Sequence, residues 1–318
     1  MINKPPLIIL SGPTATGKTD LSVLFAMQHD LEVISADSAQ VYKGMDIGSA
    51  KITEEEKRGI PHHLIDVCDI CEDYSAFRFK EMASEAIADI YKRGKVPIVV
   101  GGTGFYIQAL LKGVNFDDDG PDEEYRGSLQ KLAELNGAGY LHERLSEVDP
   151  ESADKIPEGN VKRVIRALEY HHLTGKKISD HNEEESKREP EFNAAYFVLI
   201  DDREQMYERI DKRVDKMIEG GLEEEVRTLL EKGADPSFVS MQAIGYKEMI
   251  PYIRGEYSLE EAVYNIKLRT RHFAKRQVTW YKREPDVIYI NRGDFEGDNN
   301  KMSDFMYREC LKRGIFNE

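Results

Sequence analysis

Residues 7–22, with the sequence LIILSGPTATGKTDLS, place the strongest constraint on the fold of this 318-residue chain. Four apolar residues precede the pattern Gly12-x-x-x-x-Gly17-Lys18-Thr19, which has the spacing of a phosphate-binding P-loop. In such a loop a buried strand ends, a glycine-rich turn exposes its N–H groups, and a helix N-terminus faces the bound anion. The segment therefore predicts an α/β fold in which the first strand leads into a phosphate site.

Composition narrows the class of protein further. With 40% hydrophobic and 32% charged residues, the chain is typical of a soluble globular protein. No apolar run approaches the ~20 residues that cross a bilayer, so no membrane partner is expected. The N-terminal MINKPPLIIL lacks a signal peptide's apolar region and cleavage site, which favours a cytoplasmic location. Cys68 and Cys71 form a C-x-x-C without a second ligand pair, so neither a zinc site nor a redox site is predicted.

Charge is distributed unevenly along the chain. The formal net charge is −15, which by itself argues against a nucleic-acid partner. Residues 267–283, however, hold no acid and seven cations: Lys267, Arg269, Arg271, Lys275, Arg276, Lys282 and Arg283. Such an asymmetry predicts a positive face on an otherwise acidic molecule.

Hydrophobic periodicity predicts a parallel sheet with helices on both faces. Short apolar runs alternate with helical stretches, and we expect strands over residues 7–10, 31–37, 63–67, 96–102, 195–200 and 287–290. The acidic, Gly/Pro-containing segment 117–121 marks a boundary. We therefore predict a P-loop NTPase-like α/β core over residues 1–117 and 195–318, with a mostly helical insert domain over 118–194. In the insert, residues 182–192 are expected to form a charged return to the core.

Asp37 is the first candidate for chemistry outside the P-loop. It follows the expected strand 31–37, and ligands of open α/β sheets bind at the carboxyl ends of the strands. A carboxylate there can hold a magnesium ion or accept a proton from a nucleophile, although a turn or helix N-cap is the simpler interpretation. The strand 96–102 ends in Gly101-Gly102-Thr103-Gly104 and offers no carboxylate, which weakens the interpretation as an ATP hydrolase.

Several other residues are weaker candidates. Arg203, Arg209 and Arg213 lie on one expected helix, and one of them is predicted to clamp a phosphate. The segment Asp118–Asp122 matches a D-D-x-x-D diphosphate motif, but its Gly-Pro would break the required helix, so an acidic hinge is favoured. The adjacent histidine pairs 62–63 and 171–172 lack the spacing of metal ligands on a helix. Trp280 is either a base-stacking residue or part of the core.

Taken together, these motifs resemble the tRNA dimethylallyltransferase family, also called tRNA isopentenyltransferase, in its bacterial type. The matching stretches run in order over residues 12–281: GPTATGKT, SADSAQVYKGMDIGSAK, GIPHHLID, GKVPIVVGGTGFY, RVIRALEYHHLTGK, AIGYKEM and TRHFAKRQVTWY. The resemblance implies that the P-loop holds dimethylallyl diphosphate. It also implies transfer of the prenyl group to N6 of the adenosine 3′ of the tRNA anticodon, in a monomeric protein.

The resemblance also assigns roles to individual residues. It implies Asp37 as the general base, Mg²⁺ as cofactor near Thr19, and Arg213 as the arginine on the diphosphate. The diphosphate-binding residues would be Gly12, Pro13, Thr14, Ala15, Thr16, Gly17, Lys18 and Thr19. Contacts to the anticodon stem-loop would come from Asp37, Ser38, Ala39, Gln40, Thr103, Arg126, Lys162, Arg163, Val164, Ile165 and Arg166, with phosphate contacts from the basic segment 267–283.

Three other functions share some of these features. A P-loop nucleotide kinase would also combine a phosphate loop, an insert and a clamping arginine. A P-loop RNA-binding protein without activity would keep the basic face. An enzyme that prenylates free adenine nucleotides would have no use for that face. Whether ATP also occupies the loop is left open by the sequence.

Overall fold

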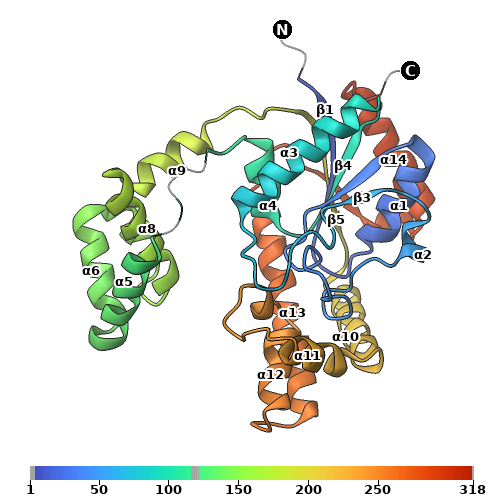
Figure 1. Ribbon diagram of the computed structural model, residues 1–318. Coiled ribbons are helices and arrows are strands. Elements are labelled where there is room, and N and C mark those ends of the chain that lie inside the picture. Colours follow the sequence, from blue (N-terminus) through green and yellow to red (C-terminus); the bar gives the residue numbers. More distant parts are fainter. Residues whose placement is uncertain (1–3, 116–119, 121, 317–318) are drawn as a thin grey trace. The chain divides into compact units, whose positions relative to one another are not determined.

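The computed structural model describes residues 4–115, 120 and 122–316, and it divides into two compact units (Figure 1). The first unit combines Met1–Leu111 with Glu191–Glu318, and the second is Lys112–Pro190. The sequence placed these divisions at 117/118 and 194/195. Each unit has its own hydrophobic core, as expected for a domain and an inserted domain.

The first unit is built on a six-stranded sheet in which every neighbouring pair is parallel. The strand order is β3-β2-β4-β1-β5-β6. The central strand β1 is apolar and almost completely buried because both faces of a parallel sheet are covered. The strands are β1 Pro6–Ser11, β2 Glu32–Ser35, β3 His62–His63, β4 Pro97–Gly101, β5 Asn193–Ile200 and β6 Ile288–Asn291. The predicted P-loop NTPase-like sheet is therefore confirmed.

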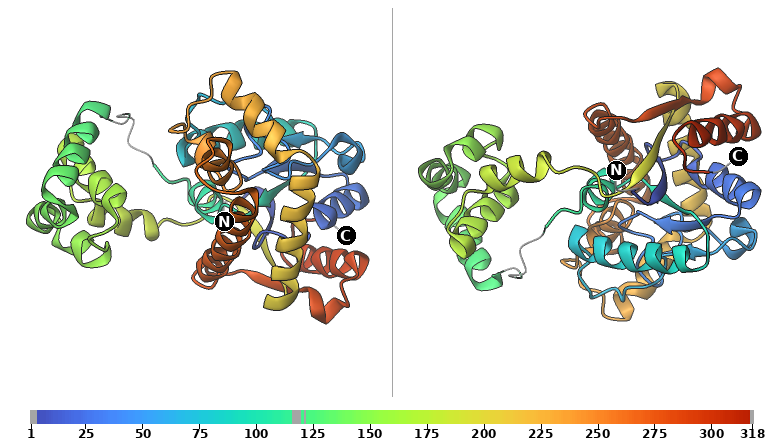
Figure 2. Two further views of the ribbon diagram at one scale, coloured as in Figure 1. Left: turned by 90° about the horizontal axis from the view of Figure 1, so that it is seen from below. Right: turned by 90° about the horizontal axis from the view of Figure 1, so that it is seen from above.

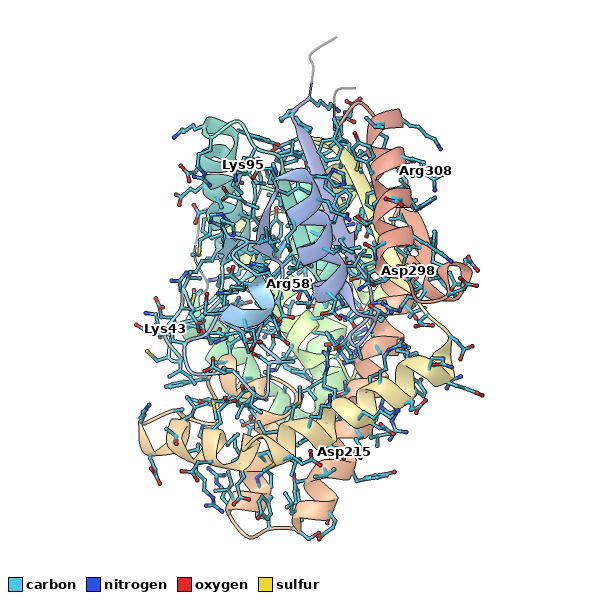
Figure 3. The ribbon with its side chains drawn as sticks, turned by 90° about the vertical axis from the view of Figure 1, so that its right-hand side faces the viewer. Lys43, Arg58, Lys95, Asp215, Asp298 and Arg308 are labelled. Carbon is cyan, nitrogen blue, oxygen red and sulfur yellow. The ribbon has the colours of Figure 1, made fainter. Side chains whose placement is uncertain are left out.

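Helices cover both faces of this sheet. On one face, α1 Lys18–His29 and α14 Asn299–Lys312 lie side by side (Figure 3), and their apolar side chains join those of the strands in one core. On the other face lie α3 Ala76–Lys92 and α4 Gly104–Leu111. A buried row on α3, which includes Phe79, Ala83, Ile87 and Ile90, follows the helical period and explains this packing.

A third group of helices gathers at the carboxyl ends of the strands. In the left view of Figure 2 these helices lie nearest the viewer. They are α10 Arg203–Glu219, α11 Leu222–Glu231, α12 Tyr246–Ile253 and α13 Leu259–Tyr281, with the short helices η1 Ser240–Gln242 and α2 Glu54–Lys57 nearby in the same unit. Helix α13 begins at the N-cap Ser258, whose side chain accepts a hydrogen bond from the N–H of Glu261, as is common for a serine at this position.

The second unit contains five helices among its described residues: α5 Glu123–Asn136, α6 Ala138–Val148, α7 Pro150–Lys155, α8 Val161–Thr174 and α9 Ile178–Ser186. Leu129, Leu141, Leu145 and Leu168 meet in its core. The predicted helical character of the insert is confirmed over these residues. Most of the acidic motif Asp118–Asp122 lies outside the described residues.

Two predictions about elements need correction. The strand expected over 63–67 is only two residues long, because Leu64 and Asp66 take left-handed backbone conformations with φ of 63° and 55°. The charged return expected over 182–192 is helical as far as Ser186, since α9 continues through the acidic run. Among the described residues, no helix is both long and apolar enough to cross a bilayer.

Candidate active site

The P-loop turns between β1 and α1 through two glycines that no other residue could replace without strain. Gly12 has φ 147°, and a Cβ there would stand 2.2 Å from the carbonyl oxygen of Leu199. Gly17 has φ 85° and forms the N-cap of α1. The loop therefore places the open N-terminus of a 12-residue helix against the cavity, where backbone N–H groups attract an anion.

Lys18 is the charged group of the loop. Its Nζ donates to the carbonyl oxygens of Gly12 and Pro13 at 3.0 and 2.8 Å. Desolvation and the nearby Arg213 lower the pKa of Lys18 to about 7, while Asp37 opposes the shift. The site therefore concentrates positive charge that a bound diphosphate would stabilise.

Side chains distant in sequence hold the loop in shape, and of these only Arg209 was a candidate from the sequence, as a phosphate clamp. Gln277 on α13 accepts from the N–H of Thr14 at 2.9 Å and donates to the carbonyl oxygen of Gly102 at 2.8 Å. Arg209 Nε donates to the carbonyl oxygen of Ala15 at 2.8 Å, and Arg292 donates to that of Thr16 at 3.1 Å. Both arginines also pair with Asp201, which follows β5.

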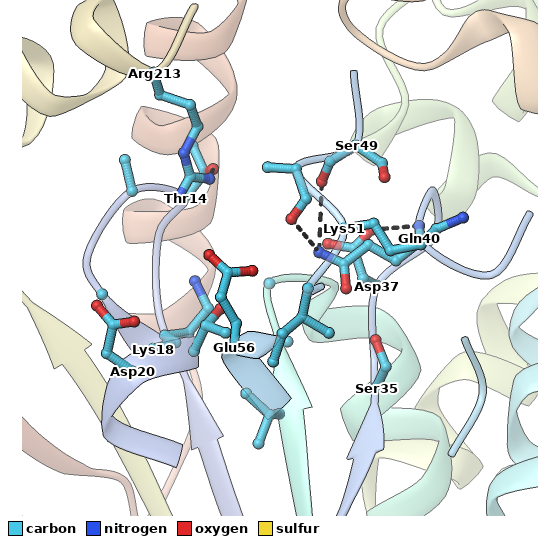
Figure 4. Close-up of a pocket in the computed structure, with 18 of the residues that line it drawn as sticks. Thr14, Lys18, Asp20, Ser35, Asp37, Gln40, Ser49, Lys51, Glu56 and Arg213 are labelled. Atoms are coloured by element: carbon cyan, nitrogen blue, oxygen red, sulfur yellow. Dashed lines mark hydrogen bonds between the residues drawn. The ribbon is translucent and has the colours of Figure 1, made fainter. Parts of the chain in front are cut away.

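Asp37 lies at the carboxyl end of β2, and β4 separates that strand from β1. Its Oδ1 accepts from the N–H groups of Ala39 and Gln40 at 2.8 and 3.2 Å. These two bonds orient the carboxylate, as in an Asx turn. Asp37 and Lys18 line the same cavity (Figure 4), so the predicted base and the predicted phosphate site meet.

Gln40 connects Asp37 to the loop that forms the opposite wall. Its Nε2 donates to the carbonyl oxygens of Ser49 and Ala50 at 3.4 and 3.1 Å. This loop is tied to helix α11 by Glu225, which accepts from the N–H groups of residues 46, 47 and 48 at 2.8–3.1 Å. Lys51 adds hydrogen bonds to Tyr42, Asp46 and Asp66.

The three candidate arginines of α10 take different positions. Arg213 lines the cavity beside the P-loop, and its guanidinium lies 3.4 Å from the hydroxyl of Thr14. Desolvation lowers the pKa of Arg213, and the nearby carboxylate of Asp37 opposes this shift. The guanidinium is therefore buried in the site and interacts electrostatically with Asp37. Arg209 also lines the cavity but is occupied by Ala15 and Asp201. Arg203 stacks over Tyr207 instead, 5.1 Å from the ring centre.

The cavity is large and is lined by both polar and apolar side chains. Its volume is about 810 Å³, enough for more than a diphosphate. Polar groups of the P-loop, Asp37 and Arg213 share it with apolar side chains, among them Val33, Ile47, Ile52, Met217 and Phe273. His62 also lines it, and desolvation lowers the pKa of this imidazole. Such a cavity suits a ligand with an anionic head and an apolar or aromatic remainder.

The donor groups of the cavity fit a magnesium ion. Mg²⁺ binds oxygen ligands and usually keeps several waters and substrate phosphate oxygens. The cavity is lined by the hydroxyl of Thr19 and by the carboxylates of Asp20, Asp37 and Glu56. Within the described residues no set of three His, Cys, Asp or Glu side chains forms a complete protein cage for a metal. A magnesium ion held here would take its remaining ligands from water or from the oxygens of a bound phosphate.

The structure separates the residues predicted to contact tRNA. In the first unit, Asp37 and Gln40 line the cavity, whereas Ser38, Ala39 and Thr103 are not among the described residues that line it. In the second unit, Arg126 and Arg166 both bind the buried carboxylate of Glu169. Lys162, Arg163, Val164 and Ile165 lie on the same helix as Glu169, and the two apolar residues point into the core of the unit.

The basic segment 267–283 is divided between two faces of α13. Lys267 pairs with Asp215 of α10 (labelled in Figure 3) at 2.6 Å, Arg269 with Glu248 at 3.2 Å, and Arg271 with Asp211 at 3.6 Å. The remaining helical cations face outward around a shallow depression lined by His272, Lys275, Arg276, Thr279, Trp280 and Arg283. Trp280 is half-buried and packs edge to face against the exposed Phe105, so it belongs to this surface rather than to the core.

Comparison with known proteins identifies the family. The family model described as IPP transferase matches residues 40–284. A tRNA dimethylallyltransferase of Lachnoclostridium phytofermentans is 53% identical over 301 residues, covering 95% of this chain and 96% of its own length.

Solved structures agree with this match. A full-length tRNA isopentenylpyrophosphate transferase of Bacillus halodurans is 40% identical with a TM-score of 0.73, and 98% of each chain is covered. A eukaryotic dimethylallyltransferase described as acting on tRNA is 33% identical with a TM-score of 0.75, covering 90% of this chain and 74% of its own. The chain belongs to the IPP transferase family.

Proposed function

We propose that this enzyme transfers the dimethylallyl group of dimethylallyl diphosphate to N6 of the adenosine 3′ of the anticodon in tRNA. The observation that carries the proposal is the shared cavity, in which a phosphate loop and an oriented carboxylate come from neighbouring parts of one sheet edge. Apolar side chains of the same cavity provide surface for a five-carbon chain. The similar proteins named above are transferases whose names give this group and tRNA.

Asp37 would act as the general base. The exocyclic amine of adenine is a weak nucleophile, so removal of its proton as the new bond forms lowers the barrier. N6 bonds to the terminal carbon of the prenyl group, the proton passes to Asp37, and the carbon–oxygen bond to the diphosphate breaks. The two N–H groups on Oδ1 fix the carboxylate, and Oδ2 would accept the proton.

The P-loop would stabilise the leaving group. Negative charge grows on the diphosphate as the carbon–oxygen bond stretches, and fixed positive groups stabilise that charge more than they stabilise the substrate. The α1 N-terminus, Lys18 and Arg213 supply these groups. Mg²⁺ bound beside Thr19 would supply further positive charge to the diphosphate oxygens.

The target adenosine must leave the stack of the anticodon loop to reach the cavity. The outward cations of α13 would bind backbone phosphates around it, and this binding would weaken with salt. Asp37 and Gln40, at the wall of the cavity, would then meet the flipped base.

The proposal is tested by following the prenyl group. Protein, Mg²⁺, dimethylallyl diphosphate with a radiolabelled prenyl group, and an unmodified tRNA with adenosine after its anticodon are incubated beside the variant Asp37→Ala. We expect label in the tRNA with the wild type and a loss of about 10²–10⁴-fold in rate with the variant. Phosphate transfer from ATP to AMP without labelled tRNA would instead establish a nucleotide kinase.

A further inference from the structure

Glu169 is a completely buried carboxylate in the helical insert, on α8 (Figure 1). Three hydrogen bonds and one ion-pair contact converge on its two oxygens. Oε1 lies 2.7 Å from Arg126 Nε and accepts from the N–H of Asp122 at 3.0 Å. Oε2 accepts from Arg126 at 3.0 Å and from Arg166 at 2.8 Å. The carboxylate of Glu169 therefore binds Arg126 with both oxygens and Arg166 with one.

The arginines differ from the carboxylate in exposure. The side chains of Arg126 and Arg166 are 34% and 47% exposed, whereas that of Glu169 is 0% exposed. Burial by itself would raise the pKa of Glu169, but hydrogen bonds from the two arginines more than reverse this and leave the pKa below its usual value. The carboxylate is thus a fixed anion beneath two cations that still reach the surface.

We propose that Glu169 is a positioning residue which fixes the guanidinium of Arg166 as a rigid receptor for RNA backbone phosphates. Arg126 completes the cluster beneath it, since its remaining nitrogen pairs with Glu123 at 3.2 Å. This inference rests on the proposed function. A guanidinium can bind phosphate with two parallel N–H groups, but only when its plane is set in advance. Arg166 uses one nitrogen on Glu169, and its half-exposed remainder is available to a phosphate. The neighbouring Lys162 and Arg163 on α8 extend the same positive surface.

The alternative role of Glu169 is purely structural, and the two roles predict opposite effects on RNA binding. If only net charge mattered, Glu169→Gln would make the insert more positive and would tighten RNA binding. If position matters, the same change frees the guanidinium groups to adopt many rotamers, and RNA binding weakens despite the added charge. The sign of the change separates the two roles.

Asp149 provides a matched control within the same unit. It is also a buried carboxylate, and it accepts four hydrogen bonds, but its partners are the N–H and hydroxyl groups of Ser152 and Ser179. Asp149→Asn therefore removes an equally buried charge whose hydrogen-bond partners include no cation. Comparing the two variants separates loss of stability from loss of arginine placement.

The experiment measures the dissociation constant of an unmodified anticodon stem-loop at several salt concentrations, together with that of inorganic pyrophosphate and the melting temperature. For Glu169→Gln we expect RNA binding to weaken roughly 5- to 30-fold, which corresponds to one or two lost phosphate contacts at physiological salt. Pyrophosphate binding should stay within twofold. Asp149→Asn should lower the melting temperature and leave RNA binding unchanged.

Arg166→Ala keeps the inference testable if Glu169→Gln does not fold. It should weaken RNA binding to the extent of one phosphate contact, and adding it to Glu169→Gln should cost less than the sum of the two. RNA binding by Glu169→Gln that equals or exceeds wild type would overturn the inference alone. Failure of the wild type to bind the stem-loop would overturn the proposed function and the inference with it.

Discussion

Lys18 lies where the central strands of the sheet end, and desolvation lowers its pKa to about 7. Its ordinary value is 10.5, so between these two values the folded chain binds fewer protons than the unfolded chain. A bound diphosphate favours the protonated ammonium and raises the pKa again. Diphosphate binding should therefore be coupled to proton uptake above pH 7.

This coupling predicts that pyrophosphate affinity falls as pH rises from 7 to 9, and that calorimetry at pH 8 in HEPES and in Tris gives different heats because a proton is taken up. Lys18→Met should bind more weakly and should take up fewer protons than the wild type, since the titration of pyrophosphate itself is common to both. Equal proton uptake by the two proteins would contradict the assignment of the proton to Lys18.

Arg213 and Arg203 lie on the same helix, α10, but differ in their surroundings. Arg213 lines the cavity and Arg203 stacks on Tyr207. Arg213→Ala should lower kcat for prenyl transfer by about 10²–10³-fold, as expected for loss of one group that stabilises transition-state charge. Arg203→Ala should change kcat by less than twofold under steady-state assay. Equal losses in the two variants would mean that Arg213 acts through the fold of α10.

Some of the site residues could be predicted from the sequence because their signals are local. The P-loop spacing is contained in eight residues, and Asp37 follows an apolar run directly. Gln277 could not be found in this way, because its partner Thr14 lies 263 residues away and an amide in a helix carries no motif of its own. The choice among three arginines likewise depended on where α10 points each side chain.

At the scale of elements, the wall opposite the P-loop depends on helix α11. Glu225 accepts from three consecutive N–H groups of the loop 46–48 and from the hydroxyl of Tyr246 at 2.6 Å. Glu225→Gln removes the charge and one acceptor position, which we expect to cost roughly 1–3 kcal/mol in unfolding free energy. The loop should then open more often.

The matched control for this change is Glu223→Gln on the same helix. Glu223 binds Arg227 and the hydroxyl of Tyr252 and does not contact the loop in the described structure. The initial rate of tryptic cleavage after Lys51 should rise with Glu225→Gln and stay at the wild-type rate with Glu223→Gln. A wild-type rate for both variants would show that Glu225 does not anchor the loop.

The two faces of helix α13 are expected to have different roles, one in stability and one in binding tRNA. Lys267 is paired with Asp215, whereas Lys275 faces the surface depression. Lys275→Ala should make the slope of log K for tRNA against log salt shallower by about 0.7–0.9, the range for one phosphate contact on a single strand or a duplex. Lys267→Ala should reduce thermal stability and leave the slope unchanged, measured by filter binding at four or more salt concentrations. A change of slope with Lys267→Ala alone would reverse this assignment.

Helices and strands could be predicted where an apolar run, or a helical repeat of apolar residues, extends over many residues. β1, β4 and β5 are apolar runs buried on both faces, and α13 repeats its buried positions over 23 residues. The run 63–67 has three apolar residues among five, but two left-handed residues turn the chain after His63. The residue types of Leu64 and Asp66 do not predict the left-handed backbone conformations that make this turn.

For the molecule as a whole, the alternation of strands and helices along the sequence was enough to predict a parallel sheet covered by helices. Alternation of apolar runs and helices requires right-handed crossovers and leaves few arrangements for a parallel sheet. The carboxyl edge of that sheet then had to carry the ligands. The placement of α10 to α13 at this edge was not predictable, because it depends on long-range contacts such as those of Gln277 and Arg209 with the P-loop.

In the proposed reaction the P-loop binds the diphosphate that leaves the prenyl group, not a nucleotide that is hydrolysed. A reaction of unmodified tRNA and Mg²⁺ with dimethylallyl diphosphate labelled in both the prenyl group and the phosphates distinguishes the two. We expect one prenyl group in the tRNA for each intact pyrophosphate released, with no orthophosphate and no requirement for ATP. Release of orthophosphate, or tRNA labelling that depends on ATP hydrolysis, would contradict this proposal.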